Sequence, residues 1–84
     1  MKVYVKLYAL LRQHHPGPNR SIPLEISLED GAVVSDLIPE LGLDPRFVRN
    51  AFVNNQACPL DAPLQEGDQV ALFPPVVGGA EEGL

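Results

Sequence analysis

Residues 69–73 read QVALF, and this apolar run predicts the last strand of a small sheet. Gly67-Asp68 forms a turn into the strand, and Pro74-Pro75 ends it and stiffens the segment that follows. Beyond Val77 no apolar periodicity remains. We therefore expect one folded domain over residues 1–77 and a flexible tail over residues 78–84.

Residues 3–9 predict a matching first strand. Alternate residues share one apolar face, namely Val3, Val5, Leu7 and Ala9, and Tyr4, Lys6 and Tyr8 share the other. Because the first and last strands are both strongly apolar, we expect them side by side and parallel at the centre of the sheet. The remaining elements then form the crossover between them.

Residues 21–29, SIPLEISLE, alternate without interruption and predict a second strand with one buried face. Pro23 cannot donate a hydrogen bond to a neighbouring strand, so it marks a sheet edge or a strand end. The connection over residues 10–20 is rich in turn-forming residues, and its start is compatible with a helical turn. Its length favours an antiparallel pair of strands.

After a turn at Glu29-Asp30-Gly31 the apolar spacing becomes helical, at Val34, Leu37, Ile38 and Leu41. Pro39 is unfavourable inside a helix, so the helix should be short, starting near Ser35 or bending, and Gly42 is a plausible stop. Asp44-Pro45 then opens a brief turn through Arg49.

A hairpin completes the pattern, with strands at residues 51–53 and 56–58 around a tight turn at Asn54-Asn55. The order of elements is strand, strand, helix, short strands and strand. It predicts an α+β fold with one main helix packed across a mixed sheet of four to five strands.

Residues 61–79, DAPLQEGDQVALFPPVVGG, resemble the signature end of the small subunit of molybdopterin synthase (MoaD-like). This family belongs to the ubiquitin-like β-grasp sulfur carriers, which also include the ThiS-type carriers of thiazole synthesis. Residues 5–12 and 31–43 are similar to the family's first strand and helix. The FPPV segment before the glycine pair favours the molybdopterin branch.

The resemblance implies a function centred on Gly79. A ubiquitin-activating-type enzyme adenylates the C-terminal carboxylate with ATP, and a sulfur donor converts the adenylate to a thiocarboxylate. The sulfur is then delivered to a pyranopterin precursor inside the large subunit of molybdopterin synthase. The chain would have no active site of its own and bind no cofactor or metal. The expected partner contacts are Phe73, Pro74, Pro75, Val76, Val77 and Gly78.

The chain departs from the family pattern because Ala80-Glu81-Glu82-Gly83-Leu84 follows the second glycine. A Gly79 in peptide linkage to Ala80 has no carboxylate to activate. We therefore expect a protease to cut after Gly79, and the resemblance implies a JAMM-type zinc metalloprotease. The alternative is that the extension persists and the glycines form only a flexible end. Two further departures, Val33 at the helix start and Pro39 within it, do not touch function.

Two other classes of function stay open. One is a sulfur carrier for another pathway, or a ubiquitin-like modifier conjugated through Gly79. The other is a non-catalytic binding module that uses the β-grasp surface alone.

Net charge and composition limit the classes of partner that this chain can bind. The net charge is −5, and a chain ending at Gly79 would have 6 basic and 9 acidic residues, or −3. This acidity disfavours nucleic acid and suits a partner with a basic surface, although acidity can also serve solubility alone. The apolar runs are too short to span a membrane, and one cysteine fits a reducing compartment. We expect a cytoplasmic protein.

Other chemically capable residues have simpler interpretations. The sequence favours Cys58 as a small buried apolar residue and His14-His15 as surface residues. Three carboxylates near turns are predicted to be solvated: Asp61, Glu66 and Asp68. Tyr4 and Tyr8 beside Lys6 are equally compatible with a partner-binding patch and with ordinary sheet surface.

Overall fold

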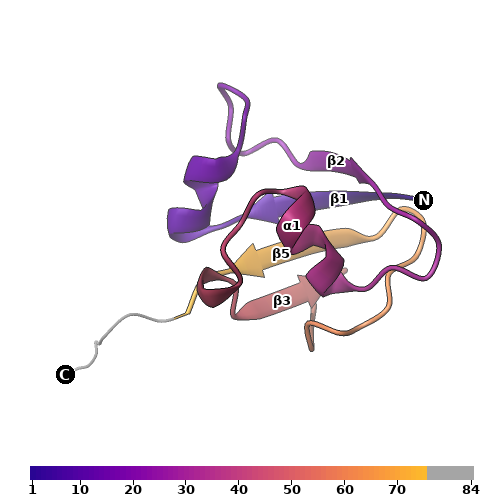
Figure 1. The fold of residues 1–84 in the computed structure, drawn as a ribbon. Coiled ribbons are helices and arrows are strands. Elements are labelled where there is room, and N and C mark those ends of the chain that lie inside the picture. Colours follow the sequence, from indigo (N-terminus) through magenta and orange to yellow (C-terminus); the bar gives the residue numbers. More distant parts are fainter. Residues whose placement is uncertain (76–84) are drawn as a thin grey trace.

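The strand β5 (Gln69–Phe73) lies at the centre of a five-stranded mixed sheet (Figure 1). It pairs in parallel with β1 (Lys2–Leu7) and antiparallel with β3 (Asn50–Val53). The edges are β2 (Leu24–Ser27) and β4 (Gln56–Cys58), in the order β2-β1-β5-β3-β4. The computed structural model describes residues 1–75. The predicted parallel centre of the sheet is confirmed.

The hydrophobic core lies on one face of this sheet. Val5 lies opposite Val70 and Leu7 opposite Leu72 across the central pair, and all four side chains are buried. The helix α1 (Leu37–Glu40) covers this face, as Figure 1 shows, and contributes Leu37 and Ile38. Within residues 1–75, no helix combines the length and the apolar character needed to cross a membrane.

The main helix is short, as Pro39 predicts. A 3₁₀ turn, η2 (Val34–Asp36), leads directly into α1, and Asp36 Oδ2 accepts a hydrogen bond from the backbone N–H of Val33 at 2.8 Å. Pro39 falls in the first turn of α1, where a backbone N–H is not required. Gly42 ends the helix with a φ of +68°, a conformation that glycine adopts without strain.

The hairpin at Asn54-Asn55 and the turn after Asp44 form where the sequence predicts them. Asn54 and Asn55 adopt φ values of +52° and +70° between β3 and β4, which is the backbone of a two-residue hairpin turn. The 3₁₀ helix η3 (Pro45–Phe47) is shorter than predicted. Asp44 caps it by accepting a hydrogen bond from Arg46 N at 2.9 Å.

Two strand boundaries differ from the prediction. The first strand was predicted to include Ala9, but β1 ends at Leu7 and the 3₁₀ helix η1 (Ala9–His14) begins at Ala9. Ala9 is therefore exposed, with a φ of +54°. The strand β2 starts only after Pro23, which lacks the backbone N–H that pairing needs. Ile22 therefore lies outside the sheet and is 56% exposed, although its place in the alternating pattern predicted burial.

The prediction that both histidines lie on the surface is wrong for His15. Its side chain is 9% exposed, whereas His14 is exposed. The backbone N–H of Gly17 donates to His15 Nδ1 at 3.0 Å, so Nε2 carries the proton and donates to the Ile22 carbonyl at 2.8 Å. A Cβ at residue 17 would meet His15 Cε1 at 3.1 Å, so a glycine permits this approach. His15 thus fastens the loop between η1 and β2.

Replacing His15 by alanine should lower the free energy of unfolding by about 1–2 kcal/mol, because two partly buried backbone groups lose their partner. Urea denaturation followed by circular dichroism measures this loss. The His14→Ala variant is the matched control and should stay within about 0.5 kcal/mol of the parent chain, as an exposed substitution normally does. Equal effects of the two substitutions would contradict the fastening role of His15.

Candidate partner-binding site

Phe73 is the last residue of β5 and lies on the face of the sheet opposite the core. Val70 and Leu72 alternate toward the core and are buried, whereas Phe73 is half-buried. Its carbonyl accepts a hydrogen bond from Arg49 N at 2.9 Å, which fixes the backbone where the strand ends.

Two other aromatic side chains hold the Phe73 ring. The ring of Tyr8 stacks on it, with centroids 4.4 Å apart and planes 13° apart. The ring of Phe52 meets it edge-on, with centroids 5.5 Å apart and planes 72° apart. Both arrangements are favourable for aromatic rings. The aromatic cluster (Tyr8, Phe52 and Phe73) therefore links β3 to the C-terminal ends of β1 and β5.

The aromatic cluster borders a groove of about 460 Å³ on the same side of the sheet. The groove is lined by Tyr4, Lys6, Tyr8, Pro23, Phe52, Asn55, Gln69, Val70 and Ala71. Ala71 lies opposite both Lys6 and Phe52 in the strand pairing, and its small side chain leaves room between its larger neighbours. We call this side the open face, because the side chains that point to it are half or fully exposed.

Charge is unevenly placed on the open face. At one end, Lys2 Nζ forms an ion pair with Glu25 Oε2 at 2.9 Å. The hydrogen bond and the negative charge of Glu25 raise the pKa of Lys2 above its usual value. At the other end the aromatic cluster supplies apolar surface, with Lys6 exposed between the two ends. The open face is thus most apolar next to the end of β5, where the chain continues out of the sheet.

The structure describes three of the residues that the sequence predicted for the site. Phe73, Pro74 and Pro75 are half-buried at the end of β5, and their contact with a partner stays a prediction. Val76, Val77, Gly78 and Gly79 lie outside the described residues. The sequence did not single out Phe52. Its strand position, two residues after Asn50, which pairs with Phe73, is the signal that places it on the same face.

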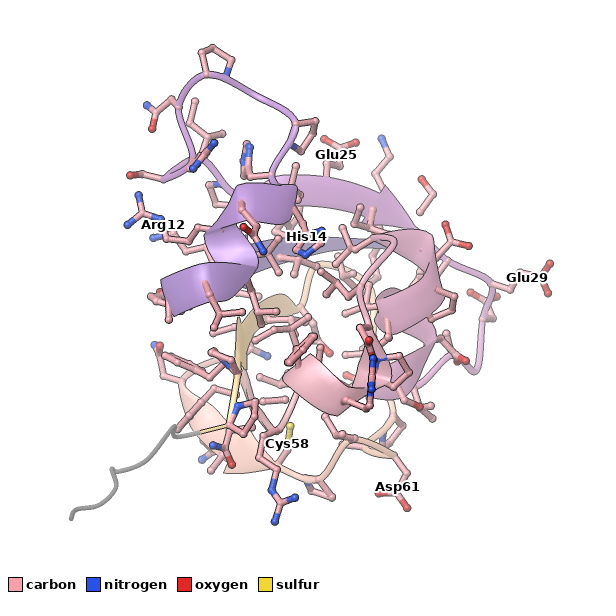
Figure 2. The ribbon with its side chains drawn as sticks, turned by 60° about the vertical axis from the view of Figure 1, so that its left-hand side comes forward. Arg12, His14, Glu25, Glu29, Cys58 and Asp61 are labelled. Atoms are coloured by element: carbon pink, nitrogen blue, oxygen red, sulfur yellow. The ribbon has the colours of Figure 1, made fainter. Side chains whose placement is uncertain are left out.

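The carboxylates near the last turns do not form an acid–base pair. Asp68 accepts hydrogen bonds from Gln65 N at 2.8 Å and from Asn54 Nδ2 at 3.0 Å, and Glu66 accepts one from Lys2 N at 3.0 Å. These two carboxylates therefore have a structural role beyond the solvation that the sequence predicted. Asp61 is exposed at the periphery, as predicted (Figure 2).

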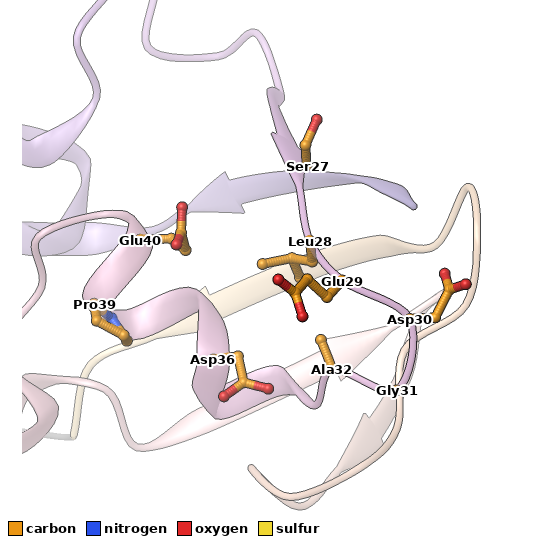
Figure 3. A pocket seen from close by; sticks show the side chains of 9 residues that line it. All are labelled: Ser27, Leu28, Glu29, Asp30, Gly31, Ala32, Asp36, Pro39 and Glu40. Carbon is orange, nitrogen blue, oxygen red and sulfur yellow. The ribbon is translucent and has the colours of Figure 1, made fainter.

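A second hollow, of about 750 Å³, lies away from the open face, between α1 and the loop after β2. Four of its lining residues are acidic: Glu29, Asp30, Asp36 and Glu40. Figure 3 shows their carboxylates spread around the groove rather than gathered at one point. Within the part of the chain that the structure describes, no three His, Cys, Asp or Glu side chains are placed to hold a metal ion. We interpret this hollow as a solvated acidic groove.

Cys58 packs against the core from β4, but it is half-buried rather than buried as the sequence predicted (Figure 2). Its Sγ lies 3.7 Å from the carbonyl oxygen of Ala51. Burial raises the pKa of the Cys58 thiol, so the reactive thiolate is disfavoured. A role as nucleophile or persulfide carrier therefore has no support from its surroundings.

The raised pKa predicts slow alkylation of Cys58 by iodoacetamide in the folded chain, compared with the urea-unfolded chain at the same pH. It also predicts a pH dependence of stability, since the unfolded thiol loses its proton first as the pH rises. The contribution is present below the unfolded pKa and is lost as the pH rises through the folded pKa. Comparing wild type with Cys58→Ala by urea denaturation between about pH 8 and about pH 10 checks the sign. Equal alkylation rates in the two states would contradict this account.

Comparisons with known proteins agree with this architecture. The profile of the ThiS family matches residues 5–79. No match was found among curated protein sequences.

Solved structures of similar proteins cover nearly the whole chain. A putative molybdopterin converting factor, subunit 1, from Pyrococcus furiosus is 33% identical, with a TM-score of 0.68, and the match covers 90% of this chain and 99% of that one. SAMP1 from Haloferax volcanii is 25% identical, with a TM-score of 0.67 and coverage of 94% and 100%. A ubiquitin-like protein from Caldiarchaeum subterraneum, 20% identical with a TM-score of 0.50 over 93% and 100%, shares the fold.

The comparisons confirm the predicted fold as a ubiquitin-like β-grasp. The family match extends over the sheet, the aromatic cluster and the segment through Gly79. The chain therefore belongs to the ThiS family of ubiquitin-like sulfur carriers and modifiers.

Proposed function

We propose that this chain is a sulfur carrier for molybdopterin biosynthesis, acting through Gly79 after residues 80–84 are removed. The observation that carries the proposal is the extent of the family match, which ends at the second glycine and leaves AEEGL beyond it. The similarity to the Pyrococcus furiosus molybdopterin converting factor, at 33% identity, favours the molybdopterin branch.

The proposed chemistry takes place on the C-terminal carboxylate. A carboxylate oxygen of Gly79 attacks the α-phosphorus of ATP in the activating enzyme, and pyrophosphate leaves. A sulfur donor at the oxidation level of sulfide then attacks the acyl carbon, and AMP leaves to give the thiocarboxylate. ATP is bound by the partner, and this chain supplies the reacting carbon. Glycine residues lack a Cβ, which suits a thread that must enter a narrow cleft.

The described residues support a model in which the folded domain binds the partner and the C-terminal segment carries the reacting group. The aromatic cluster offers an apolar surface on a rigid sheet, and surfaces of this kind commonly anchor protein partners. Gly79 lies six positions after Phe73, so the reacting carbon can lie up to roughly 20 Å from this anchor. A partner can therefore hold the open face while its active site reaches Gly79. The partners proposed are a ubiquitin-activating-type enzyme, a molybdopterin synthase large subunit and a JAMM-type protease.

A second function is favoured by a specific similarity. SAMP1 of Haloferax volcanii is a small archaeal modifier protein, and the match covers all of that chain at 25% identity. A modifier would be joined through Gly79 to a lysine of another protein by an isopeptide bond. The open face would then recognise the conjugating machinery rather than a synthase subunit.

The intact mass of the protein purified from its native cell tests these functions. A sulfur carrier loses the mass of residues 80–84, and a fraction of it gains the difference between sulfur and oxygen. A modifier shows Gly79 joined to lysine after proteolysis. A chain that always keeps AEEGL contradicts both and leaves the non-catalytic binding module.

A further inference from the structure

Half of the basic residues of this acidic chain line one hollow between the end of β1, η1 and the loop before β2. The sequence has 6 basic and 11 acidic residues. The hollow has a volume of about 130 Å³, and the residues that line it are Lys6, Leu7, Tyr8, Arg12, Arg20 and Ser21. Figure 2 shows Arg12 extending outward from η1. We call this feature the cationic hollow.

The other three basic residues are not grouped in this way. Lys2 is paired with Glu25 at 2.9 Å, and Arg46 with Asp44 at 2.7 Å. Arg49 is exposed after η3 and, like the three cations of the hollow, takes part in no ion pair within residues 1–75. It does not line the hollow, and none of the described residues that do is acidic. Like charges held together repel one another, so a negative group placed among them is favoured.

Hydrogen bonds hold the loop that forms one wall of the cationic hollow. Asn19 Oδ1 accepts a hydrogen bond from the backbone N–H of Ser21 at 3.0 Å, which closes the turn that carries Arg20. His15 Nε2 donates to the carbonyl of Ile22 at 2.8 Å and fastens the next residue of the loop. The other two cations stand on β1, inside the sheet, and on η1, whose buried residue belongs to the core. The three cations therefore stand on backbone that is already positioned for a ligand.

The size and place of the cationic hollow indicate what it binds. Its volume is below the roughly 300–1,000 Å³ of small-molecule sites, so it suits a side chain better than a whole metabolite. Lys6 and Tyr8 line both the hollow and the groove of the open face, so a protein that covers the groove also reaches the hollow. The net charge of −5 opposes polyanions such as nucleic acid. These observations favour a carboxylate on a protein surface.

We propose that the cationic hollow binds acidic side chains of the protein partner that covers the open face. Arginine binds a carboxylate through two parallel hydrogen bonds, and the Ser21 hydroxyl can donate a third. An acidic chain attracts a basic partner in many orientations, but only one orientation places acidic side chains of the partner in the hollow. Such a contact fixes the register of the complex. The identity of the partner as the activating enzyme rests on the proposed function.

Two-dimensional amide NMR of the 84-residue chain, titrated with a blocked triglutamate peptide, tests the binding directly. The peptide should shift a group of amide signals around the hollow: Lys6, Tyr8, Arg12, Arg20 and Ser21. A blocked triglutamine peptide should not shift them. The shifts should fall by more than half when the salt concentration rises from about 0.1 M to about 1 M, since the screening length drops from roughly 10 Å to roughly 3 Å.

Two single substitutions supply the matched comparison. Arg12→Gln should raise the dissociation constant of the triglutamate peptide by roughly threefold or more, as expected for the loss of one exposed charge pair. Arg49→Gln removes the same charge outside the hollow and should leave the dissociation constant unchanged. The proposal is overturned if the two variants have equal effects, if triglutamine shifts the same signals, or if the signals of the hollow do not move. It is also overturned if inorganic phosphate binds the hollow more tightly than the peptide does, which indicates a phosphate ligand.

The same variants are then compared in the complex with the activating enzyme. Arg12→Gln should weaken binding of the chain that ends at Gly79 more than Arg49→Gln does, and the difference should shrink at high salt. Equal affinities would overturn the role of the hollow in this complex. The peptide titration needs no enzyme and no reaction at Gly79, so its failure is distinct from failure of the proposed function.

Discussion

A chain that ends at Gly79 should support ATP–pyrophosphate exchange by its activating enzyme, whereas the 84-residue chain should give only the background measured without a carrier. The reason is chemical. Adenylation needs a carboxylate oxygen as nucleophile, and in the longer chain the carbonyl of Gly79 belongs to an amide bond with Ala80. Exchange of labelled pyrophosphate into ATP, with the two chains at equal concentration, measures the difference.

The control for this result keeps the peptide bond and removes the charge. The 84-residue chain with Glu81→Gln and Glu82→Gln should be as inactive as the unaltered one, because the bond and not the acidity blocks the reaction. Intact-mass analysis after the assay verifies that neither chain has been trimmed. Exchange by an untrimmed chain would contradict the proposed role of Gly79.

Replacing Phe73 by alanine should weaken binding of the trimmed chain to its activating enzyme by roughly 30-fold or more, which corresponds to about 2 kcal/mol for a well-anchored aromatic residue. Phe73 is the shared member of both ring contacts, with Tyr8 and with Phe52. The substitution therefore removes the ring that the aromatic cluster shares, at the end of the open face from which the C-terminal segment continues. Isothermal titration calorimetry measures the dissociation constant.

The Phe47→Ala variant is the matched control, because Phe47 is 46% exposed on η3 and lies outside the aromatic cluster. It should bind the activating enzyme with the affinity of the parent chain. Circular dichroism at the temperature of the titration must show both variants folded, so that lost affinity reports the contact and not unfolding. If Phe73→Ala binds as tightly as Phe47→Ala, the aromatic cluster is not the anchor.

Much of the fold could be predicted, because the secondary structure that the apolar patterns and turn residues favour is also the one that buries the apolar side chains. QVALF and the first strand are apolar enough to require the centre of the sheet, and the structure places β1 and β5 there. Pro39 limited the helix, and Asn54-Asn55 marked the hairpin turn, through properties of single residues. Boundaries that depend on pairing were less predictable. Ile22 continues the alternation of β2, yet no strand partner reaches it beyond Pro23.

The candidate site could be predicted only where it adjoins the sequence motif. Phe73 was identifiable because it precedes the prolines and glycines of the tail. The contribution of Phe52 depends on strand register across β3 and β5, which alternation within one strand does not specify. His15 shows the same limit, because its burial depends on acceptors and donors at Ile22 and Gly17 that only the folded loop brings together.

The parallel pairing of β1 and β5 has a mechanical consequence. Because the strands run in the same direction, the start of β1 and the end of β5 lie at opposite ends of the pair. A force that pulls on the C-terminal segment while the start of β1 is held therefore acts along the two strands in opposite directions. The hydrogen bonds between them are then stretched together in shear instead of opening one after another. The domain is thus built to keep its shape under tension at the very end where its chemistry is expected.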